Sequence, residues 1–238
     1  MSYITFNGVR SDELGLRLLS NREISTTARD YSLIEIAGRD GAFTQDNNRL
    51  AVVEQEFQFA LFDDVVPNVS KISYWLNQSV GFKSFEMAWD SKYQYYAQSK
   101  GAIGVQEILK RYGKCKITFV FQPIKHRKDS LTKEILINKT MTFINDGHVK
   151  AYPKLIFTGA NEVKFKINGR ELALKSIQGN VTVDADSHMV YRTENVTKIS
   201  AWDNVLLTSE RPYLDIGENK LEISAGQAVM VAKIGEML

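Results

Sequence analysis

The residue types that most often carry catalysis or bind metals are few and scattered in this chain. The three histidines, His126, His148 and His188, stand far apart, and none belongs to an HxH, HExxH or Cys/His spacing. No GxSxG motif marks a nucleophile held beside a base. The single cysteine, Cys115, lies between two lysines that could lower the pKa of its thiol, but its place in an apolar run favours packing. We therefore expect no catalytic residues, no metal site, no cofactor and no enzymatic activity.

Two acidic pairs could in principle hold a cation or act as acid and base. The stretch NVTVDADSHM offers Asp184 and Asp186, but it lacks the glycine and the closing glutamate of a calcium loop. Asp63 and Asp64 could work as acid and base, yet they follow an apolar run and precede Pro67. We interpret the first pair as a turn, and the second as the end of a strand that leads into a helix.

The stretch EIAGRDGAF, residues 35–43, places Arg39 and Asp40 between Gly38 and Gly41. A phosphate-binding loop would run from a strand through the glycines into the start of a helix. Here the glycines are followed by a polar loop and then by a strand-like run, so the phosphate interpretation fails on context. The glycines instead predict a sharp chain reversal, because they adopt positive φ without steric cost.

The segment around this turn, about residues 20–50, is unusually long for a connection between two strands, since loops beyond roughly 15 residues in compact domains are usually functional. We predict that it forms a hairpin arm that leaves its own domain to pair with a neighbouring subunit. The residues expected at that interface are Ile34, Ile36, Gly38, Arg39, Asp40, Gly41 and Phe43.

Aromatic residues gather between residues 82 and 101. Alternation assigns most of them to a core and leaves Tyr93, Tyr95 and Tyr96 as the exposed set. Exposed tyrosines are common in protein interfaces, and with neighbouring lysines they can also stack on bases or sugars. We favour a partner contact over ligand stacking for these three residues.

Period-2 alternation of apolar and polar residues dominates the chain and predicts a mainly β protein. The only good helix pattern covers residues 67–78, with Ile72, Trp75 and Leu76 on one face. Residues 105–112 fit either a helix or a strand. The clearest strands are VVEQEFQFALF, CKITFVF, EVKFKINGRELAL with its Asn-Gly hairpin turn, GNVTVDAD and NKLEISAGQAVMVAK.

The composition limits the classes of partner that the chain is expected to bind. The chain of 238 residues carries 30 basic and 28 acidic residues, a net charge of +2, which is too small for a protein that binds nucleic acid by neutralising phosphates. No stretch approaches the roughly 20 apolar residues of a membrane span, and the charged N-terminus does not resemble a secretory signal. One cysteine allows no intrachain disulfide, as expected of assembly in a reducing cytoplasm.

A break in composition at residues 122–133, FQPIKHRKDS and its flank, predicts an interdomain connection. We expect an N-terminal β domain over residues 1–130, which carries the arm, and a C-terminal domain over residues 131–238. In the second half, turn signals at 146–147, 168–169, 179–180 and 217–219 separate short strands and predict a small β-sandwich.

The order of these patterns resembles the distal tail protein (Dit) family of long, flexible-tailed bacteriophages over essentially the full length. The stretches that carry the resemblance are ITFNGVRSDELGLRLL, EIAGRDGAF, CKITFVFQPI, INKTMTFINDGHVKAYPKLIFTG, VKFKINGRELAL, VTVDADSHMVY and LDIGENKLEIS. The resemblance implies an N-terminal, β-sandwich-like ring domain with one short helix and a belt-like arm. It also implies a C-terminal, galectin-like β-sandwich.

The resemblance further implies a structural role in the virion, at the tail tip. It implies a homo-oligomeric ring, usually of six subunits, that is assembled in the host cytoplasm and links the tail tube protein to the tail-tip hub. A receptor-binding protein is a further expected partner.

An alternative is a carbohydrate- or receptor-binding module of the tail tip. The residues that could serve it lie around Trp202, beside Asp203 and Asn204, because a tryptophan with polar neighbours can form a sugar platform. A tryptophan buried in the sandwich is the favoured interpretation of the same pattern.

Overall fold

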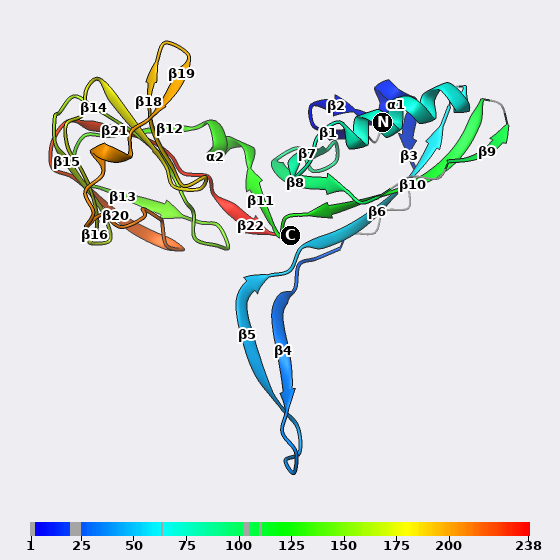
Figure 1. Cartoon of the computed structure of the whole chain (residues 1–238), viewed down its shortest axis with the longest axis horizontal. Helices are drawn as coiled ribbons and strands as arrows, with labels where there is room; N and C mark the ends of the chain where they lie inside the picture. Colours follow the sequence, from blue (N-terminus) through cyan, green and yellow to red (C-terminus); the bar gives the residue numbers. More distant parts are fainter. Residues whose placement is uncertain (1–2, 20–24, 63, 102–104, 110) are drawn as a thin grey trace. The chain divides into compact units, whose positions relative to one another are not determined.

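The computed structural model describes the chain except residues 1–2, 20–24, 63, 102–104 and 110. It divides into two compact units (Figure 1). Unit 1 comprises residues 1–125 with 237–238, and unit 2 comprises residues 126–236. The chain therefore passes between the units twice, after residue 125 and after residue 236. The prediction of a mainly β protein is confirmed, since strands dominate both units.

Most of unit 1 is built on a ten-stranded sheet, in which the order along the main path is β2-β1-β7-β8-β10-β6-β3 and whose strands β11 and β22 include residues at the boundary with unit 2. Strand β9 pairs with β10, β11 pairs with β8 and β22, and the arm strands β4 and β5 form a separate two-stranded sheet. The bounds are β1 Ile4–Phe6, β2 Val9–Arg10, β3 Leu16–Leu18, β4 Arg29–Glu35, β5 Ala42–Leu50, β6 Val53–Leu61, β7 Lys83–Met87, β8 Tyr93–Ser99, β9 Val105–Leu109, β10 Tyr112–Phe121, β11 Ile124–Arg127 and β22 Gly235–Met237. A short 3-10 helix, η1, covers Ser11–Leu14.

The core of unit 1 forms where the apolar face of this sheet meets the long helix α1, Val65–Asn77. Strands β6 and β10 pair in register over nine residues and turn the predicted alternating side chains to the same face. Phenylalanine rings dominate this face, and Phe85 and Phe119 meet edge-to-face at 5.0 Å between ring centroids. Trp75 of α1 completes the core by donating a 3.0 Å hydrogen bond from Nε1 to the carbonyl of Phe6.

The helix predicted at 67–78 is confirmed, although it begins two residues earlier. Pro67 is its third residue and not its first. A proline is tolerated there because the first backbone N–H groups of a helix have no partner within the helix. The predicted face is correct, since Ile72, Trp75 and Leu76 are all buried.

Unit 2 is a sandwich of two antiparallel sheets, and the core lies between them. The six-stranded sheet has the order β12-β21-β14-β17-β18-β19, and the four-stranded sheet has the order β13-β20-β15-β16. The bounds are β12 Glu134–Ile137, β13 Met141–Asn145, β14 Lys154–Thr158, β15 Val163–Ile167, β16 Arg170–Leu174, β17 Asn180–Asp184, β18 Met189–Glu194, β19 Thr197–Ser200, β20 Gly217–Ile223 and β21 Gln227–Val231. Two short helices, α2 Lys128–Thr132 and η2 Trp202–Asn204, complete the unit.

The sandwich core follows from the alternation in its strands. Phe157 of β14 and Phe165 of β15 meet across the two sheets, 5.6 Å apart between ring centroids and both fully buried. The hairpin predicted at the Asn-Gly pair joins β15 and β16, and both Asn168 and Gly169 have positive φ, as a type I′ turn requires.

At three places the structure differs from the local prediction or adds detail to it. The turn signal at 217–219 marks the start of β20, because only Gly217 has positive φ and the next residues already pair with β13. Within the ambiguous stretch 105–112, residues 105–109 form strand β9. The segment 122–133 is occupied by β11 and α2.

Candidate functional site: an exposed two-stranded arm

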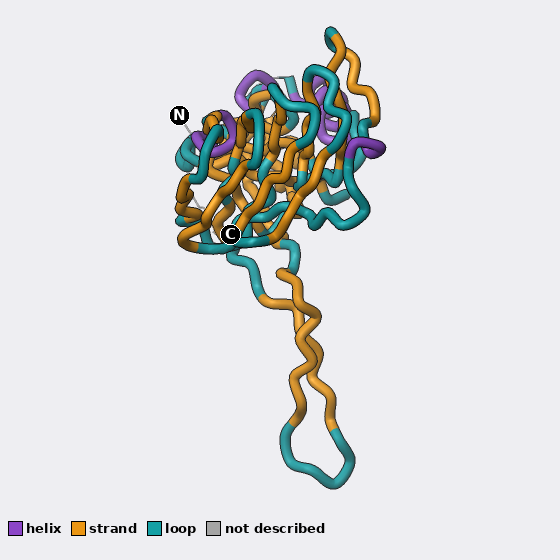
Figure 2. Tube along the Cα trace, turned by 90° about the vertical axis from the view of Figure 1, so that its left-hand side faces the viewer, coloured by secondary structure: helices purple, strands orange, loops and turns teal. Residues whose placement is uncertain are grey.

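Strands β4 and β5 leave the sheet of unit 1 as a two-stranded ribbon (Figures 1 and 2). They pair antiparallel from Arg29–Leu50 to Glu35–Ala42, and among the described residues neither strand pairs with any other. Almost every side chain from residue 29 to residue 49 is exposed. The ribbon therefore has no packing partner within the described part of its own chain, which is unusual because isolated hairpins are marginally stable in water.

Apolar side chains lie on both faces of this ribbon. Residues opposite each other in an antiparallel pair share a face, and Ile34 lies opposite Phe43, while Leu33 lies opposite Thr44. Ile34 and Phe43 are each 46% exposed, and Leu33 on the other face is 63% exposed. Tyr31 lies on the same face as Leu33 and is also exposed. The ribbon thus presents apolar surface in two directions.

The base of the arm is held by charged and polar side chains. Arg29 forms an ion pair with Asp46, with Nε 2.8 Å from Oδ2, and Asn47 donates a 3.0 Å hydrogen bond to Asp30. The hydrogen bond with Arg29 holds the pKa of Asp46 below its ordinary value. For Asp30, the hydrogen bond from Asn47, followed by that from Arg49, has the same effect on the pKa.

These contacts surround a bulge, because the register shifts between Asp30 and Tyr31. Asn48 in the bulge has a φ of 53°, a conformation that asparagine adopts more readily than most residues. A bulge increases the local twist of a ribbon and bends it. The strands are closed below it by Ala51, whose N–H donates to the carbonyl of Ala28 at 2.8 Å.

The tip of the arm is the predicted glycine turn. Gly38 and Gly41 have φ of 80° and 81°, and Arg39 N–H donates a 3.1 Å hydrogen bond to the carbonyl of Ile36. Gly38 therefore stands where a type II turn requires positive φ. The guanidinium of Arg39 lies 4.1 Å from the centroid of the Phe43 ring, so within the chain this cation stacks on its own arm.

The structure brings the predicted interface residues Ile34, Ile36, Gly38, Arg39, Asp40, Gly41 and Phe43 together on the outer part of the arm. Sequence reasoning missed Tyr31 and Leu33, which form the second apolar face. The alternation of YSLIEI contains that signal, since Tyr31, Leu33 and Glu35 must point opposite to Ser32, Ile34 and Ile36. Residues 20–24, the first part of the predicted arm segment, lie outside the described residues.

The tyrosine set does not share one exposed surface. Tyr95 is only 5% exposed and belongs to the core of unit 1, where its hydroxyl donates a hydrogen bond to Asp90. Alternation along β8 turns Tyr93, Tyr95 and Ala97 toward the core and Tyr96 away from it. Tyr93 is half-buried and carries the ammonium of Lys125 4.1 Å above its ring centroid. Tyr96 is half-buried as well.

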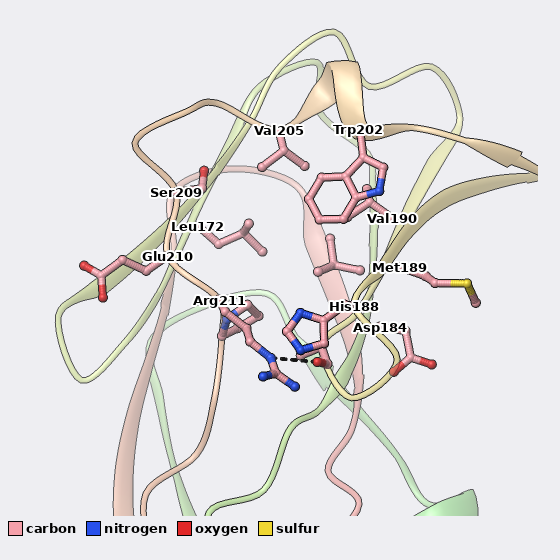
Figure 3. A pocket seen from close by; sticks show the side chains of 13 residues that line it. Leu172, Asp184, His188, Met189, Val190, Trp202, Val205, Ser209, Glu210 and Arg211 are labelled. Atoms are coloured by element: carbon pink, nitrogen blue, oxygen red, sulfur yellow. Dashed lines mark hydrogen bonds between the residues drawn. The ribbon is translucent and has the colours of Figure 1, made fainter. Parts of the chain in front are cut away.

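Trp202 is exposed, whereas the favoured interpretation placed it in the core of the sandwich. It lies in η2 and is 54% exposed, so it is not a core residue of the sandwich. The side chain stands at the rim of a pocket of about 230 Å³ within unit 2 (Figure 3). The pocket is lined by Leu172, Val183, Asp184, Ala185, His188, Met189, Val190, Trp202, Val205, Ser209, Glu210, Arg211 and Pro212.

The two acidic pairs and the cysteine that were considered for chemistry do not form a catalytic arrangement among the described residues. Lys233 Nζ lies 2.9 Å from Asp184 and 3.3 Å from Asp186, so both members of this acidic pair form an ion pair with one lysine. Burial raises the pKa of the Cys115 thiol to about 11. Asp64 precedes the first residue of α1, whereas Asp63 lies outside the described residues.

Among the residues that the structure describes, no group of three or more histidine, cysteine, aspartate or glutamate side chains is arranged to hold a metal ion. No described helix is both long enough and apolar enough to cross a membrane.

Comparison with known proteins identifies the fold. No protein-family model and no curated protein matches the chain. Among solved structures, the Dit protein (gp 19.1) of phage SPP1, described as a paradigm of the hub adsorption apparatus of phages that infect Gram-positive bacteria, superposes with a TM-score of 0.77. The match covers 100% of this chain and 99% of the SPP1 protein at 14% identity.

Chains of the phage P2 baseplate in its activated conformation are also similar. The structure with Ca gives a TM-score of 0.55 at 10% identity and covers 96% of this chain and 97% of the other. The structure with Sr gives 0.52 at 10% identity and covers 96% of each chain. The expected resemblance is confirmed at the level of the fold: the chain has a Dit-like fold along its whole length.

Proposed function

We propose that this chain is a structural, non-catalytic subunit of a phage tail tip that assembles into a closed ring. In this proposal, the arm formed by β4 and β5 packs against the next subunit. The observation that carries the proposal is the arm itself, an extended ribbon with apolar side chains on both faces and no packing partner among the described residues. Its full-length similarity in fold to proteins of phage tails and baseplates supports the location.

The exposed apolar surface of the arm gives the scale of the contact. Full burial of one large apolar side chain contributes about 1.5 to 3 kcal/mol. Tyr31, Leu33, Ile34, Ile36 and Phe43 are each roughly half exposed, so complete burial of all five would add about 5 kcal/mol per arm at 1 kcal/mol each. Association costs about 4 to 15 kcal/mol in lost freedom, so one arm alone does not ensure a stable pair.

A closed ring supplies the binding free energy that a single arm lacks. The arm and the surface that receives it are different parts of the subunit, so the contact is head-to-tail, and a rotation that closes produces a ring. Every subunit is then held on two sides, by its own arm and by the arm of its neighbour. Six subunits is the number that the resemblance to the Dit family implies, and we adopt it in the proposal.

The proposed place of this ring is the tail tip of the virion, assembled in the host cytoplasm between the tail tube protein and the tail-tip hub. A receptor-binding protein is a further proposed partner. Gold-labelled antibody against unit 2 should mark the tail end of particles that contain this protein. Label confined to capsids, or absent from intact tails, would contradict this location.

The ring is tested by removing the arm. Residues 30–47 are replaced by a short Gly-Ser linker, which the pairing of Ala28 with Ala51 allows, since these residues already hold the two ends together. The parent chain should form rings by light scattering and electron microscopy, and the deletion variant should be a folded monomer. Val196→Ala, which changes an exposed side chain on the β18–β19 hairpin of unit 2, is the control and should assemble like the parent. Assembly of the deletion variant under the same conditions would show that the arm does not hold the ring.

A further inference from the structure

The proposed ring assigns no role to the pocket beside Trp202. All of its lining residues belong to unit 2, so it lies within one compact body. Its floor consists of apolar side chains of the sandwich, among them Leu172, Val190 and Val205 (Figure 3). Its volume of about 230 Å³ lies below the roughly 300 to 1,000 Å³ of sites for drug-sized ligands. A pocket of this size accommodates one ring-sized group.

The exposure of Trp202 is a feature that needs a reason. Trp75 is 2% exposed and its Nε1 donates to a backbone carbonyl, whereas Trp202 is 54% exposed and its Nε1 has no hydrogen-bond partner among the described residues. The N–H of an exposed indole is hydrated and remains available to a ligand, whereas a buried one such as that of Trp75 is already used. The indole of Trp202 therefore presents both an apolar ring face and an unused donor at the pocket.

The backbone holds this indole in place. Trp202 opens the 3-10 helix η2, and Asn204 in the same turn donates two 2.9 Å hydrogen bonds to the carbonyls of Lys175 and Ser176. The residue before Trp202, Ala201, is buried and its N–H donates to the carbonyl of Val190. The backbone that carries Trp202 is therefore held in place and does not have to be ordered when a ligand binds.

Polar groups stand opposite the indole. His188 lies in the turn between β17 and β18 with a φ of 53°, and its ring points into the pocket (Figure 3). Arg211 is fixed beside it, because Nε donates a 2.8 Å hydrogen bond to the carbonyl of Ala185 and the guanidinium lies 3.9 Å from the centroid of the Tyr152 ring. The terminal nitrogens of Arg211 and the ring nitrogens of His188 form no hydrogen bond with described residues.

The remaining polar lining groups are already engaged or turned outward. Ser209 Oγ is 3.0 Å from both the N–H and the carbonyl of Ala173. Asp184 is paired with Lys233. Glu210 extends away from the pocket (Figure 3). The groups left for a ligand are thus one flat apolar face and several donors, all close to an apolar floor.

We propose that this pocket binds a single sugar ring of a glycan, which stacks on Trp202 and accepts hydrogen bonds from His188 and Arg211. A pyranose has one apolar C–H face and hydroxyls around its edge, so it uses both halves of the site. An aliphatic side chain of a protein would cover the indole but leave the donors of His188 and Arg211 without partners, at the cost of their hydration. The site does not depend on the ring, because every residue in it comes from one subunit.

The experiment is saturation-transfer NMR on the full chain with the methyl glycosides of glucose, galactose, N-acetylglucosamine and glucuronic acid. A ligand of roughly a dozen heavy atoms binds in the millimolar range, so each is used at about 20 mM. We expect a signal from at least one sugar. It should be lost in Trp202→Ala, weakened about five-fold or more in Arg211→Met, and unchanged in Tyr74→Ala, an exposed aromatic of α1.

Circular dichroism verifies that the Trp202→Ala variant is folded, and Trp202→Phe, which keeps a smaller stacking face, should retain a weaker signal. The absence of a signal from all four sugars, or a signal that survives Trp202→Ala, overturns the proposal. A variant at Trp202 that loses a protein partner while no sugar binds to the parent also overturns it, and assigns the pocket to a peptide.

Discussion

Truncation of Phe43 to alanine is the sharpest perturbation of the arm. In the free subunit, Phe43 lies opposite Ile34 and beneath the guanidinium of Arg39, and 46% of it stays exposed. If a neighbouring subunit covers that remainder, the lost contribution is about half of the 1.5 to 3 kcal/mol for a fully buried side chain, or about 0.7 to 1.4 kcal/mol per interface. Each interface should therefore dissociate about 3- to 10-fold more readily.

The thermal midpoint of the subunit should stay the same, because the arm strands pair only with each other among the described residues. Light scattering across a dilution series measures the assembly midpoint, and Val196→Ala is the matched control outside the arm. A variant with a lowered thermal midpoint and an unchanged assembly midpoint would contradict this role, since it would mean that Phe43 stabilises its own subunit and not the contact.

Three further outcomes follow from the cores of the two units. Trp75→Phe should lower the free energy of unfolding of unit 1 by about 1 to 3 kcal/mol in urea titrations, because it leaves the buried carbonyl of Phe6 without its donor; an unchanged unfolding midpoint would count against this packing. Burial acts to raise the pKa of Asp184, but its hydrogen bond and charge pairing with Lys233 outweigh burial and hold the pKa below its ordinary value. The resulting stability is present above the unfolded pKa of about 3.9 and is lost as the pH falls through the folded value; Lys233→Met should remove this acid-side loss in thermal melts of unit 2, and an identical pH profile would contradict the pairing. Cys115, with a pKa of about 11 caused by burial, should react with a thiol reagent at pH 8 only after denaturant is added, whereas stoichiometric reaction of the native protein would show that the thiol is accessible.

The sheets could be predicted because their strands are buried on one face. Alternation in the runs of β6 and β10 shows which side chains face inward, and it needs no knowledge of the partner strand. The Asn168-Gly169 turn could also be predicted, since few pairs of residues adopt two positive φ angles at no steric cost. The arm could be predicted from its length and its glycines, although its second apolar face was overlooked.

The exposure of Trp202 could not be predicted, because it depends on how the chain turns between elements. Trp202 points outward because Asn204 fixes a 3-10 turn through the backbone of residues 175 and 176, which are distant in the sequence. Lys233 and Asp184 meet over a separation of 49 residues, and no local pattern indicates their pairing. Contacts of this kind are set by the packing of the whole sandwich.

In the proposed ring, the arm of one subunit packs on another subunit. A photoreactive phenylalanine analogue placed at position 43, followed by irradiation and peptide mapping, tests this contact directly. We expect covalent links between subunits, visible as a ladder of oligomers that ends at the ring, with linked peptides that come from a neighbour. Links confined to peptides of the same chain, in protein that is fully assembled, would contradict it.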